Sequence, residues 1–482
     1  MHDVERILGV ILGKNLVPSK PIYLLILLQS CAHEQQAELQ NSSFSQYYEY
    51  LIVKSLKEAD FRMDHLNEMF NYLSNLAWFF KGRNATELGR ESIREFNKKF
   101  CEEYATVEFD SRLLLLQRAK ILKQDDDLFS FSYPYVYFLF VGKYLAANLY
   151  KDSIKELVGG YCKELYRKEN ANCVMFLTHH GNNPWVIDQI SEVLNGCFFH
   201  HKPIEFNGDI ASISALVNTT AQIVIEDIND RDVERNQLNS RRAADVSESR
   251  EDPEPLRSST LSSGEADSVL SFSSNINLMI KTSEILGHIT KNYYGSLERS
   301  RKASYLEQIF DGSLRSLKAI FEEIVDQPDA FVSELERMLK ERKPDLTASE
   351  SKETAKKMAF QVLGMICTGF VSRVGQVVSS EKIREDISSL VSAKSSNAYR
   401  LIEIASCLVH PGHIPFEAIE KLAKDTISNN FAFMILQSLV FYHLHMFHTK
   451  DKDKQRLAAS VKIGMSQSRS IDVATSKGKM LR

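Results

Sequence analysis

The chain has 482 residues, of which 44% are hydrophobic and 25% are charged, as is ordinary for a folded globular protein. This length allows roughly two to four domains with sizeable cores. A formal net charge of −4 excludes attraction to nucleic acid or anionic membranes through overall charge. The seven cysteines are scattered and never in CxxC spacing, which favours free thiols in a reducing cytoplasm over disulfides or a zinc site.

The sequence contains no segment that is expected to enter a membrane. The N-terminus lacks the basic segment and cleavable apolar core of a signal peptide. An apolar run from Phe431 to Phe447 is about long enough to cross a membrane, but it contains Gln437, His443 and His445. Because such side chains are costly in lipid, a buried helix explains the run better. We therefore expect a cytoplasmic protein with no membrane partner.

Apolar residues recur every three or four positions along most of the chain, which predicts a mainly α-helical fold. The first region, residues 1–105, is expected to form a helical lid-like domain. It contains a helix from Ile22 to Ser30 that is apolar on most sides and is therefore predicted to be buried. A later helix around Phe96 is expected to be capped by the residues from Asn84 to Thr86.

The spacing of apolar residues changes within residues 106–150, from a helical to an alternating pattern. After a helix that ends at Ala119, two short alternating segments flank the acidic turn Asp125–Asp127, which predicts a β-hairpin. An aromatic-rich helix then begins near Pro134. Helix, helix, hairpin, helix is the element order of a winged helix, so a winged-helix-like module is predicted. The alternative is a hairpin that rests on helices by chance.

Three further regions and a tail complete the predicted organisation. Residues 151–228 continue as a helical extension, with a break expected at Gly159-Gly160. Residues 229–268 have no aromatic side chain and dense mixed charge, which predicts a disordered linker. Residues 269–449 are expected to form a C-terminal α-helical domain of the irregular solenoid or bundle type. Residues 450–482 are polar and basic, and we expect a flexible tail.

Few residues suggest chemistry of their own. The stretch Gly9–Asn15 has only three residues between its glycines where a phosphate-binding loop has four, and Asn15 replaces the Ser or Thr that binds magnesium. A helix C-cap at Gly13 explains this stretch better. Adjacent histidines such as His179 and His180 diverge on a helix, so we expect surface or interface histidines rather than a metal site. The sequence predicts no catalytic and no metal-binding residue.

Three stretches within the first 150 residues resemble STAND-type ATPases, in the bacterial NACHT-like and antiviral branch of that family. Asn15–Ser30 is similar to the small helical lid that follows the nucleotide-binding core, and Phe44–Leu56 is similar to the next lid helix. Phe109–Tyr150 is similar to the winged helix. The resemblance rests on aromatic-rich patterns that occur in the family's order, without a catalytic signature.

The resemblance implies a role for two residues. In the family a lid proline contacts the adenine, and Pro21 is the matching position. A winged-helix residue near the end of the hairpin, often a histidine, contacts the nucleotide phosphates, and Tyr133 is the nearest match. A tyrosine can donate one hydrogen bond to a phosphate but carries no positive charge at neutral pH.

No phosphate-binding loop precedes these stretches, so we expect the regulatory and sensor half of a STAND ATPase, without catalysis of its own. Such a chain is a C-terminal fragment, or its ATPase half is a separate polypeptide. ATP or ADP is expected only where an upstream nucleotide-binding core completes the site. The expected partners are the missing core, a sensed ligand protein and further copies of the chain, with no specific nucleic acid.

The implied function is a switch in bacterial antiviral defence. Ligand recognition by the helical domains is expected to release the winged helix and to permit nucleotide exchange. Two alternatives remain open at this point. One is a non-enzymatic α-helical scaffold or adaptor, and the other is a hydrolase that uses a pair of histidines.

Overall fold

A computed structural model of the chain describes residues 44–208, 224–225, 232–240, 271–325, 328–342 and 347–465. This part of the chain is mainly α-helical, as predicted, with one sheet of three short strands and one of two. It divides into two compact units: unit 1 is Met1–Val193 with Ala244–Ser296, and unit 2 is Leu194–Ala243 with Leu297–Arg482. Pro21 and the first predicted helices lie outside the described residues.

Unit 1 consists of helices around one small sheet. Its elements up to the hairpin are α4 (Phe44–Glu58), the short 3-10 helix η1 (Met63–His65), α5 (Leu66–Gly82), β1 (Leu88–Gly89), α6 (Arg90–Glu103), α7 (Phe109–Arg118), β2 (Leu122–Asp125) and β3 (Leu128–Phe131). They are followed by α8 (Pro134–Asn148), α9 (Asp152–Lys163), α10 (Lys168–His179), α11 (Pro184–Gly196), whose last residues belong to unit 2, and α14 (Phe272–Asn292).

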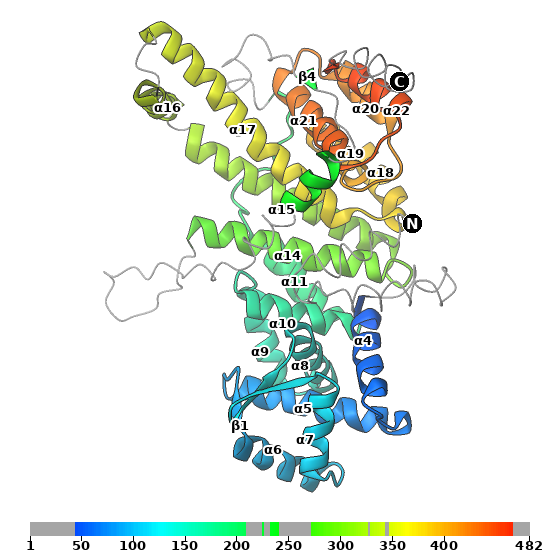
Figure 1. Cartoon of the computed structure of the whole chain (residues 1–482). Helices are drawn as coiled ribbons and strands as arrows, with labels where there is room; N and C mark the ends of the chain where they lie inside the picture. The colour runs from blue at the N-terminus through cyan, green and yellow to red at the C-terminus, as the bar shows by residue number, and fades with distance from the viewer. Residues whose placement is uncertain are drawn as a thin grey trace, which may run out of the picture. The chain divides into compact units, whose positions relative to one another are not determined.

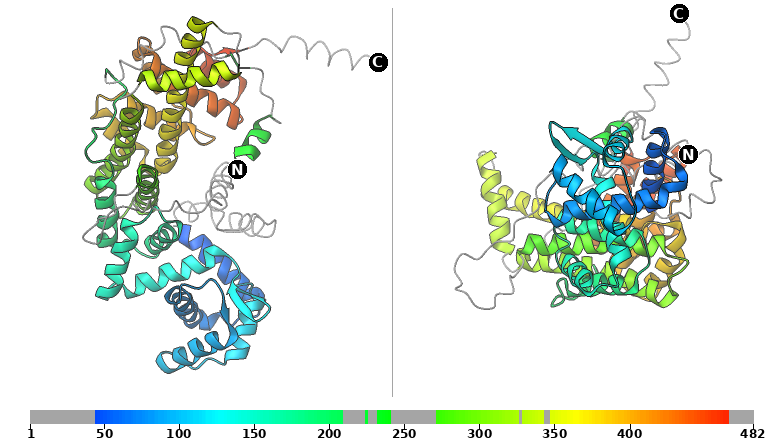
Figure 2. Two further views of the ribbon diagram at one scale, coloured as in Figure 1. Left: turned by 90° about the vertical axis from the view of Figure 1, so that its left-hand side faces the viewer. Right: turned by 90° about the horizontal axis from the view of Figure 1, so that it is seen from below.

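The predicted hairpin is present as β2 and β3. The strands pair antiparallel from Leu122 opposite Phe131 to Asp125 opposite Leu128. Asp126, in the two-residue turn, has a φ of 51°, a left-handed conformation that Asp tolerates better than most residues. Figure 2 shows the hairpin in cyan at the edge of the helices of unit 1.

The third strand of this sheet was not predicted. β1 pairs with β3, so the strand order is β1-β3-β2. As a result the expected cap of the next helix is wrong: α6 begins at Arg90, with Gly89 as its N-cap and no side-chain hydrogen bond to the cap. A strand of two residues is too short to show an alternating pattern, which is why the sequence did not indicate it.

Helix α8 lies at the centre of unit 1. It is apolar on nearly all sides, as expected of a helix that is covered all round. It contacts α5, α10 and α4 (Figure 1). Phe140 of α8 meets Phe70 of α5 edge to face, with ring centres 5.4 Å apart. Each fully buried phenylalanine of this kind stabilises the fold by about 1.5–3 kcal/mol.

The expected break at Gly159-Gly160 is wrong, because α9 runs through both glycines. Its buried residues Ile154, Val158 and Cys162 recur at helical spacing and hold the helix against its neighbours. Tertiary packing of an apolar face therefore outweighs the poor helix propensity of two glycines, about 1 kcal/mol each.

Unit 2 is built almost entirely of helices. They are α15 (Arg299–Val325), α16 (Pro328–Arg342), α17 (Ala348–Val378), η2 (Glu381–Ile383), α18 (Arg384–Ser392), α19 (Asn397–Leu408), α20 (Phe416–Asp425), α21 (Asn430–Met446) and α22 (Asp451–Ser460). Helix α17 begins with a capping box, in which Thr347 and Glu350 bond to each other's main-chain N–H groups. A short parallel pair, β4 (Val224–Ile225) and β5 (Gly464–Met465), completes the unit.

Helix α21 is the buried helix that the sequence predicted at the apolar run near the C-terminus. Its polar side chains Gln437 and His443 are buried, and both have main-chain partners, Val461 O at 2.8 Å and Leu408 O at 2.7 Å. Such bonds offset the cost of burying the imidazole of His443 and the amide nitrogen of Gln437, whereas Gln437 Oε1 is buried without a hydrogen-bond partner among the described residues. At its start, Phe431 is fully buried.

A different helix meets the length and apolarity expected of a membrane span. Within the ranges described above, α17 does so by length and composition alone. This is weak support for a membrane segment, because core helices of water-soluble folds pass the same test.

Two expected flexible segments contain ordered structure. Residues 232–240, inside the predicted linker, are helical. Val233 is buried there, and the Gln237 side chain donates to Met446 O at 2.7 Å. The predicted tail contains α22, in which Leu457 is fully buried and Arg456 pairs with Glu420 at 2.8 Å. A few apolar residues among many charges are enough to anchor a short helix on a neighbouring surface.

Candidate functional site

The β2–β3 hairpin leads directly into α8 at Tyr133. Ser132 N donates to Ile121 O at 2.9 Å, so the main-chain pairing continues just beyond the strands. Tyr133 is extended (φ −141°, ψ 139°) as the N-cap of α8, and Pro134 occupies the first turn, where its missing N–H leaves no bond unmade. The chain thus fixes Tyr133 at the N-terminal end of α8, where the helix dipole favours negative charge.

A column of aromatic rings runs from Tyr133 into the core of unit 1. Tyr133 stacks on Tyr135 with ring centres 6.0 Å apart, and Tyr135 stacks on Tyr48 at 5.7 Å. The Tyr48 ring lies 5.2 Å from Phe176 and 6.5 Å from the imidazole of His179. Burial raises the pKa of Tyr48 and of Tyr135 well above the ordinary value for tyrosine. Both hydroxyls are therefore neutral, and of the three tyrosines only Tyr133 is partly exposed.

A charged group lies where α4, α8 and the end of α10 meet. Lys143 Nζ is 3.0 Å from Glu49 Oε1 and 4.9 Å from the centre of the Phe70 ring. His180 Nδ1 is 3.7 Å from the same carboxylate oxygen, and His180 Nε2 is 2.9 Å from Leu139 O. Burial, followed by the charge of Lys143, lowers the pKa of His180 to about 4. The imidazole is therefore neutral at pH 7, and its Nε2–H donates to the Leu139 carbonyl.

Helices α8 and α10 approach each other closely at Gly142. A Cβ atom at this position would lie 2.6 Å from the carbonyl carbon of Phe176 and 2.7 Å from Leu177 N. Since neither backbone atom can move aside cheaply, the crossing requires glycine in spite of its cost inside a helix. The close crossing holds the Leu139 carbonyl within reach of the residue that follows α10.

The structure locates one of the two predicted site residues. Tyr133 lies at the end of the hairpin, as expected, whereas Pro21 lies outside the described residues, so the structure does not test its role. The sequence did not reveal Glu49 and Lys143, whose 94-residue separation leaves no local pattern. The sequence predicted surface or interface histidines, but the side chains of His179 and His180 are largely buried within unit 1. Their position between two helices depends on tertiary packing, which sequence spacing alone does not show.

The arrangement around Tyr133 can bind a ligand. It offers a partly exposed phenol ring at a helix N-terminus, which can contact an anion or a planar ring. Within the described ranges, no three or more His, Cys, Asp or Glu side chains are grouped so as to hold a metal ion.

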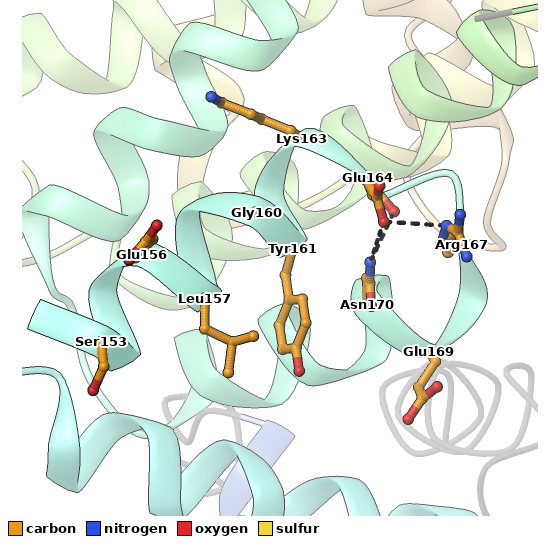
Figure 3. A pocket seen from close by; sticks show the side chains of 10 residues that line it. All are labelled: Ser153, Glu156, Leu157, Gly160, Tyr161, Lys163, Glu164, Arg167, Glu169 and Asn170. Atoms are coloured by element: carbon orange, nitrogen blue, oxygen red, sulfur yellow. Dashed lines mark hydrogen bonds and ion pairs between the residues drawn. The ribbon is translucent and has the colours of Figure 1, made fainter. Parts of the chain in front are cut away.

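A surface pocket of about 780 Å³ lies between α9 and α10 in the same unit. Figure 3 shows Tyr161 and Glu169 within it and Lys163 pointing away from the other labelled side chains. Glu164 pairs with Arg167 at 3.1 Å, and Glu169 pairs at 2.6 Å with Lys81, whose Nζ lies 5.2 Å from the centre of the Tyr161 ring. Because these charges are paired with one another, the pocket does not indicate a particular class of ligand.

A protein-family model described as Novel STAND NTPase 4 matches residues 86–141. The matched segment contains β1, α6, α7, the β2–β3 hairpin and the first half of α8, including Tyr133. The match supports a relationship between this part of unit 1 and STAND-type ATPases. No curated protein and no solved structure matches the chain.

Proposed function

We propose that the elements from α5 to β3 form a winged helix that acts as the switch of a STAND-type ATPase. One observation carries this proposal: the family match, over residues 86–141, covers α6, α7 and all three strands of a module that has the element order of a winged helix, and only its first helix, α5, lies outside the match. Three helices, α5, α6 and α7, and a three-stranded sheet closed by a hairpin are the parts such a module needs. The remaining helices of the two units act as the sensor of the switch.

In this proposal Tyr133 contacts the nucleotide phosphates in the resting state. Its location supports this role, because it follows the hairpin and caps α8 at the end where the helix dipole favours an anion. The first turn of α8 also contains no acidic residue that would repel a phosphate. Pro21 contacts the adenine, a role that follows from the family resemblance.

The sensor influences the switch through α8. The ion pair between Lys143 and Glu49 joins α8 to α4, and the bond from His180 joins α8 to the end of α10. Loss of these two contacts removes only about 1 kcal/mol each, provided that the packing of α8 against α5 and α10 is kept in both states. The two contacts can therefore bias two arrangements by about 2 kcal/mol, which lies in the range in which ligand binding can shift a population.

The nucleotide, ATP or ADP, is held by a P-loop core, for which this sequence has no motif. The chain itself then catalyses no hydrolysis and holds no cofactor alone. Its partners are that core, a sensed ligand protein and other copies of the chain. We place the protein in the cytoplasm because its cysteines are scattered and its N-terminus does not resemble a signal peptide. Its role in bacterial antiviral defence follows from the family resemblance.

The enzymatic part of the proposal is tested by measuring phosphate release from magnesium-ATP by the purified full-length chain. We expect no release above the rate in buffer. Turnover that a point substitution in this chain abolishes would contradict the proposal, since it would locate a catalytic core here.

The role of Tyr133 is tested with a purified P-loop core from a protein of the matched family, loaded with ADP. Tyr133→Phe removes one hydrogen bond to phosphate and should weaken association with the core about threefold to tenfold. Tyr133→His supplies the residue usual in the family and should bind at least as tightly as the unaltered chain. If the chain is instead an α-helical scaffold or adaptor, both variants will behave like the unaltered chain.

A further inference from the structure

Residues 202–208 of unit 2, which we call the strap, have no regular secondary structure and yet are firmly held. Ile204 and Phe206 are buried, at 2% and 0% exposure, whereas Glu205 between them is exposed. A period of two is that of an extended chain with one face against the protein. The strap is therefore held with alternate side chains on opposite sides up to Phe206, where the chain bends.

The main chain of the strap is bonded to helices on either side. Ile204 N donates to Leu314 O of α15 at 3.3 Å, and Ala398 N of α19 donates to Glu205 O at 2.9 Å. A main-chain N–H in the first turn of α19, which has no partner within its own helix, is thus satisfied by the strap.

Two asparagine side chains converge on one carbonyl of the strap. Asn397 Nδ2 and Asn429 Nδ2 both donate to Phe206 O, at 3.0 Å and 2.9 Å. Asn207 completes the pattern, because its Oδ1 accepts from Asn397 N at 3.2 Å and its Nδ2 donates to Ser395 O at 2.8 Å. These bonds are specific for an asparagine side chain at the position after Phe206.

The Phe206 side chain anchors the strap in the core of unit 2. Its ring centre lies 6.0 Å from that of Phe431, which in turn contacts the rings of Phe321 and Phe360. Phe206 also has a φ of 54°, in the left-handed region that a bulky residue rarely adopts. Its contacts hold it there against strain, and strain of this kind often marks an element that changes state.

We propose that the strap is the built-in occupant of a peptide-binding groove formed by α15, α19 and the start of α21. A partner protein binds there by displacing the strap with an extended segment of the same chemistry: an apolar residue, one spacer, an aromatic residue and an asparagine. Main-chain bonds and alternate side chains in pockets are the features by which proteins recognise extended peptides. This inference concerns unit 2 alone and does not depend on the proposed switch.

The groove is tested with a fluorescent peptide of residues 201–208 added to the full-length protein. In the unaltered protein the strap competes at an effective concentration on the order of millimolar, so micromolar peptide should not bind. Phe206→Ala removes the anchor of the strap and should raise the affinity for the peptide roughly tenfold or more. Phe199→Ala is the matched control, because Phe199 lies nearby in the sequence but is 63% exposed. A folded Phe206→Ala protein that binds the peptide no better than Phe199→Ala contradicts the inference.

A second variant decides the question if Phe206→Ala does not fold. Asn207→Ala keeps the Phe206 anchor but removes the two bonds to Asn397 N and Ser395 O. The amide hydrogens of Asn397 and Ala398 should then exchange roughly tenfold faster than in the unaltered protein, because the strap opens more often. Unchanged exchange at both amides would show that the strap does not open by this route and would overturn the proposal.

Discussion

Helices α8 and α21 both lie largely buried in their units, and they differ in how the polar groups around them are bonded. In α21, the side chains of Gln437 and His443 bond to main-chain oxygens. In α8, Lys143 pairs with the carboxylate of Glu49, and a main-chain oxygen accepts from His180. At pH 7 the bonds of α21 join uncharged groups, because burial lowers the pKa of His443, whereas α8 is joined to α4 by a pair of opposite charges. The comparison teaches that α21 is a fixed support, while α8 can respond to salt and to movement of its neighbours.

The aromatic contacts of the two helices follow the same distinction. Phe431, at the start of α21, is fully buried among phenylalanine rings. At the start of α8, the column of tyrosines ends at the partly exposed ring of Tyr133. One helix therefore begins inside a core, and the other begins at a surface where a ligand can reach it.

The largest effect is expected from removing the ring at the start of α21. Phe431→Ala should lower the free energy of unfolding by about 3–5 kcal/mol, since it leaves a cavity among three aromatic neighbours. Urea denaturation followed by circular dichroism measures this loss. Phe199→Ala, at an exposed ring, is the control and should change stability by less than about 0.5 kcal/mol. Equal effects of the two substitutions would disprove a fixed support built around Phe431.

The next largest effect concerns His180 and the pH dependence of stability. Its pKa is lowered to about 4 in the folded protein, against an ordinary value of 6.5, so the unfolded chain binds more protons between these values. The stability that comes from a neutral, buried His180 is fully present above pH 6.5 and is lost as the pH falls towards 4. The free energy of unfolding should fall by about 3 kcal/mol over this range. His180→Gln keeps an N–H donor but cannot titrate, so its unfolding free energy should vary less over this range.

The comparison of the unaltered protein with His180→Gln also controls for the other buried histidines. Burial also lowers the pKa of His443 and of His445, but both groups are present in each protein and cancel in the difference. If unfolding free energies measured from pH 7 to pH 4 fall in parallel for the two proteins, the assignment of acid sensitivity to α8 is wrong.

A smaller loss is expected where α8 crosses α10. Gly142→Ala places a Cβ atom against the Phe176 main chain and should cost about 1–3 kcal/mol, as overpacking does. Gly160→Ala is the matched control in the same unit, because no atom lies within 4 Å of its added Cβ. That change should stabilise α9 by up to about 1 kcal/mol, and thermal unfolding of the two variants distinguishes these outcomes. Stabilisation by both changes would mean that the helices do not cross this closely.

The smallest effect is expected at the ion pair between α4 and α8. Both side chains are about one-third exposed, so solvent screens the attraction. A double-mutant cycle of Glu49→Gln and Lys143→Gln should give a coupling energy of about 0.5–1 kcal/mol, smaller at high salt. A coupling that is zero at low salt would remove the proposed link between these helices.

Most helices and the hairpin could be predicted from the sequence, because their apolar residues recur at the period of the element. Thus the two strands around Asp125–Asp127 were expected and are present. The strand Leu88–Gly89 was missed because a strand of two residues is too short to show alternation of apolar and polar side chains. The order of residues 232–240 and of α22 was missed because a single buried side chain, such as Val233 or Leu457, anchors a polar segment.

The candidate site was predictable only where it depends on local order. Tyr133 was identified through the family resemblance, as the residue that follows the hairpin; the structure confirms that place but does not test its role. Glu49 and Lys143 lie in α4 and α8, and His180 directly follows α10, so only the packing of the three helices brings these residues together. The requirement for glycine at 142 likewise depends on the distance to another helix.

The central claim, that unit 1 contains the winged-helix switch of a STAND-type ATPase, is tested most directly by nucleotide-dependent association. The full-length chain is mixed with a purified P-loop core of the matched family, and binding is measured with ADP, with ATP and without nucleotide. The account predicts tight association with ADP and weaker association with ATP. No association, or equal association in all three conditions, would contradict it.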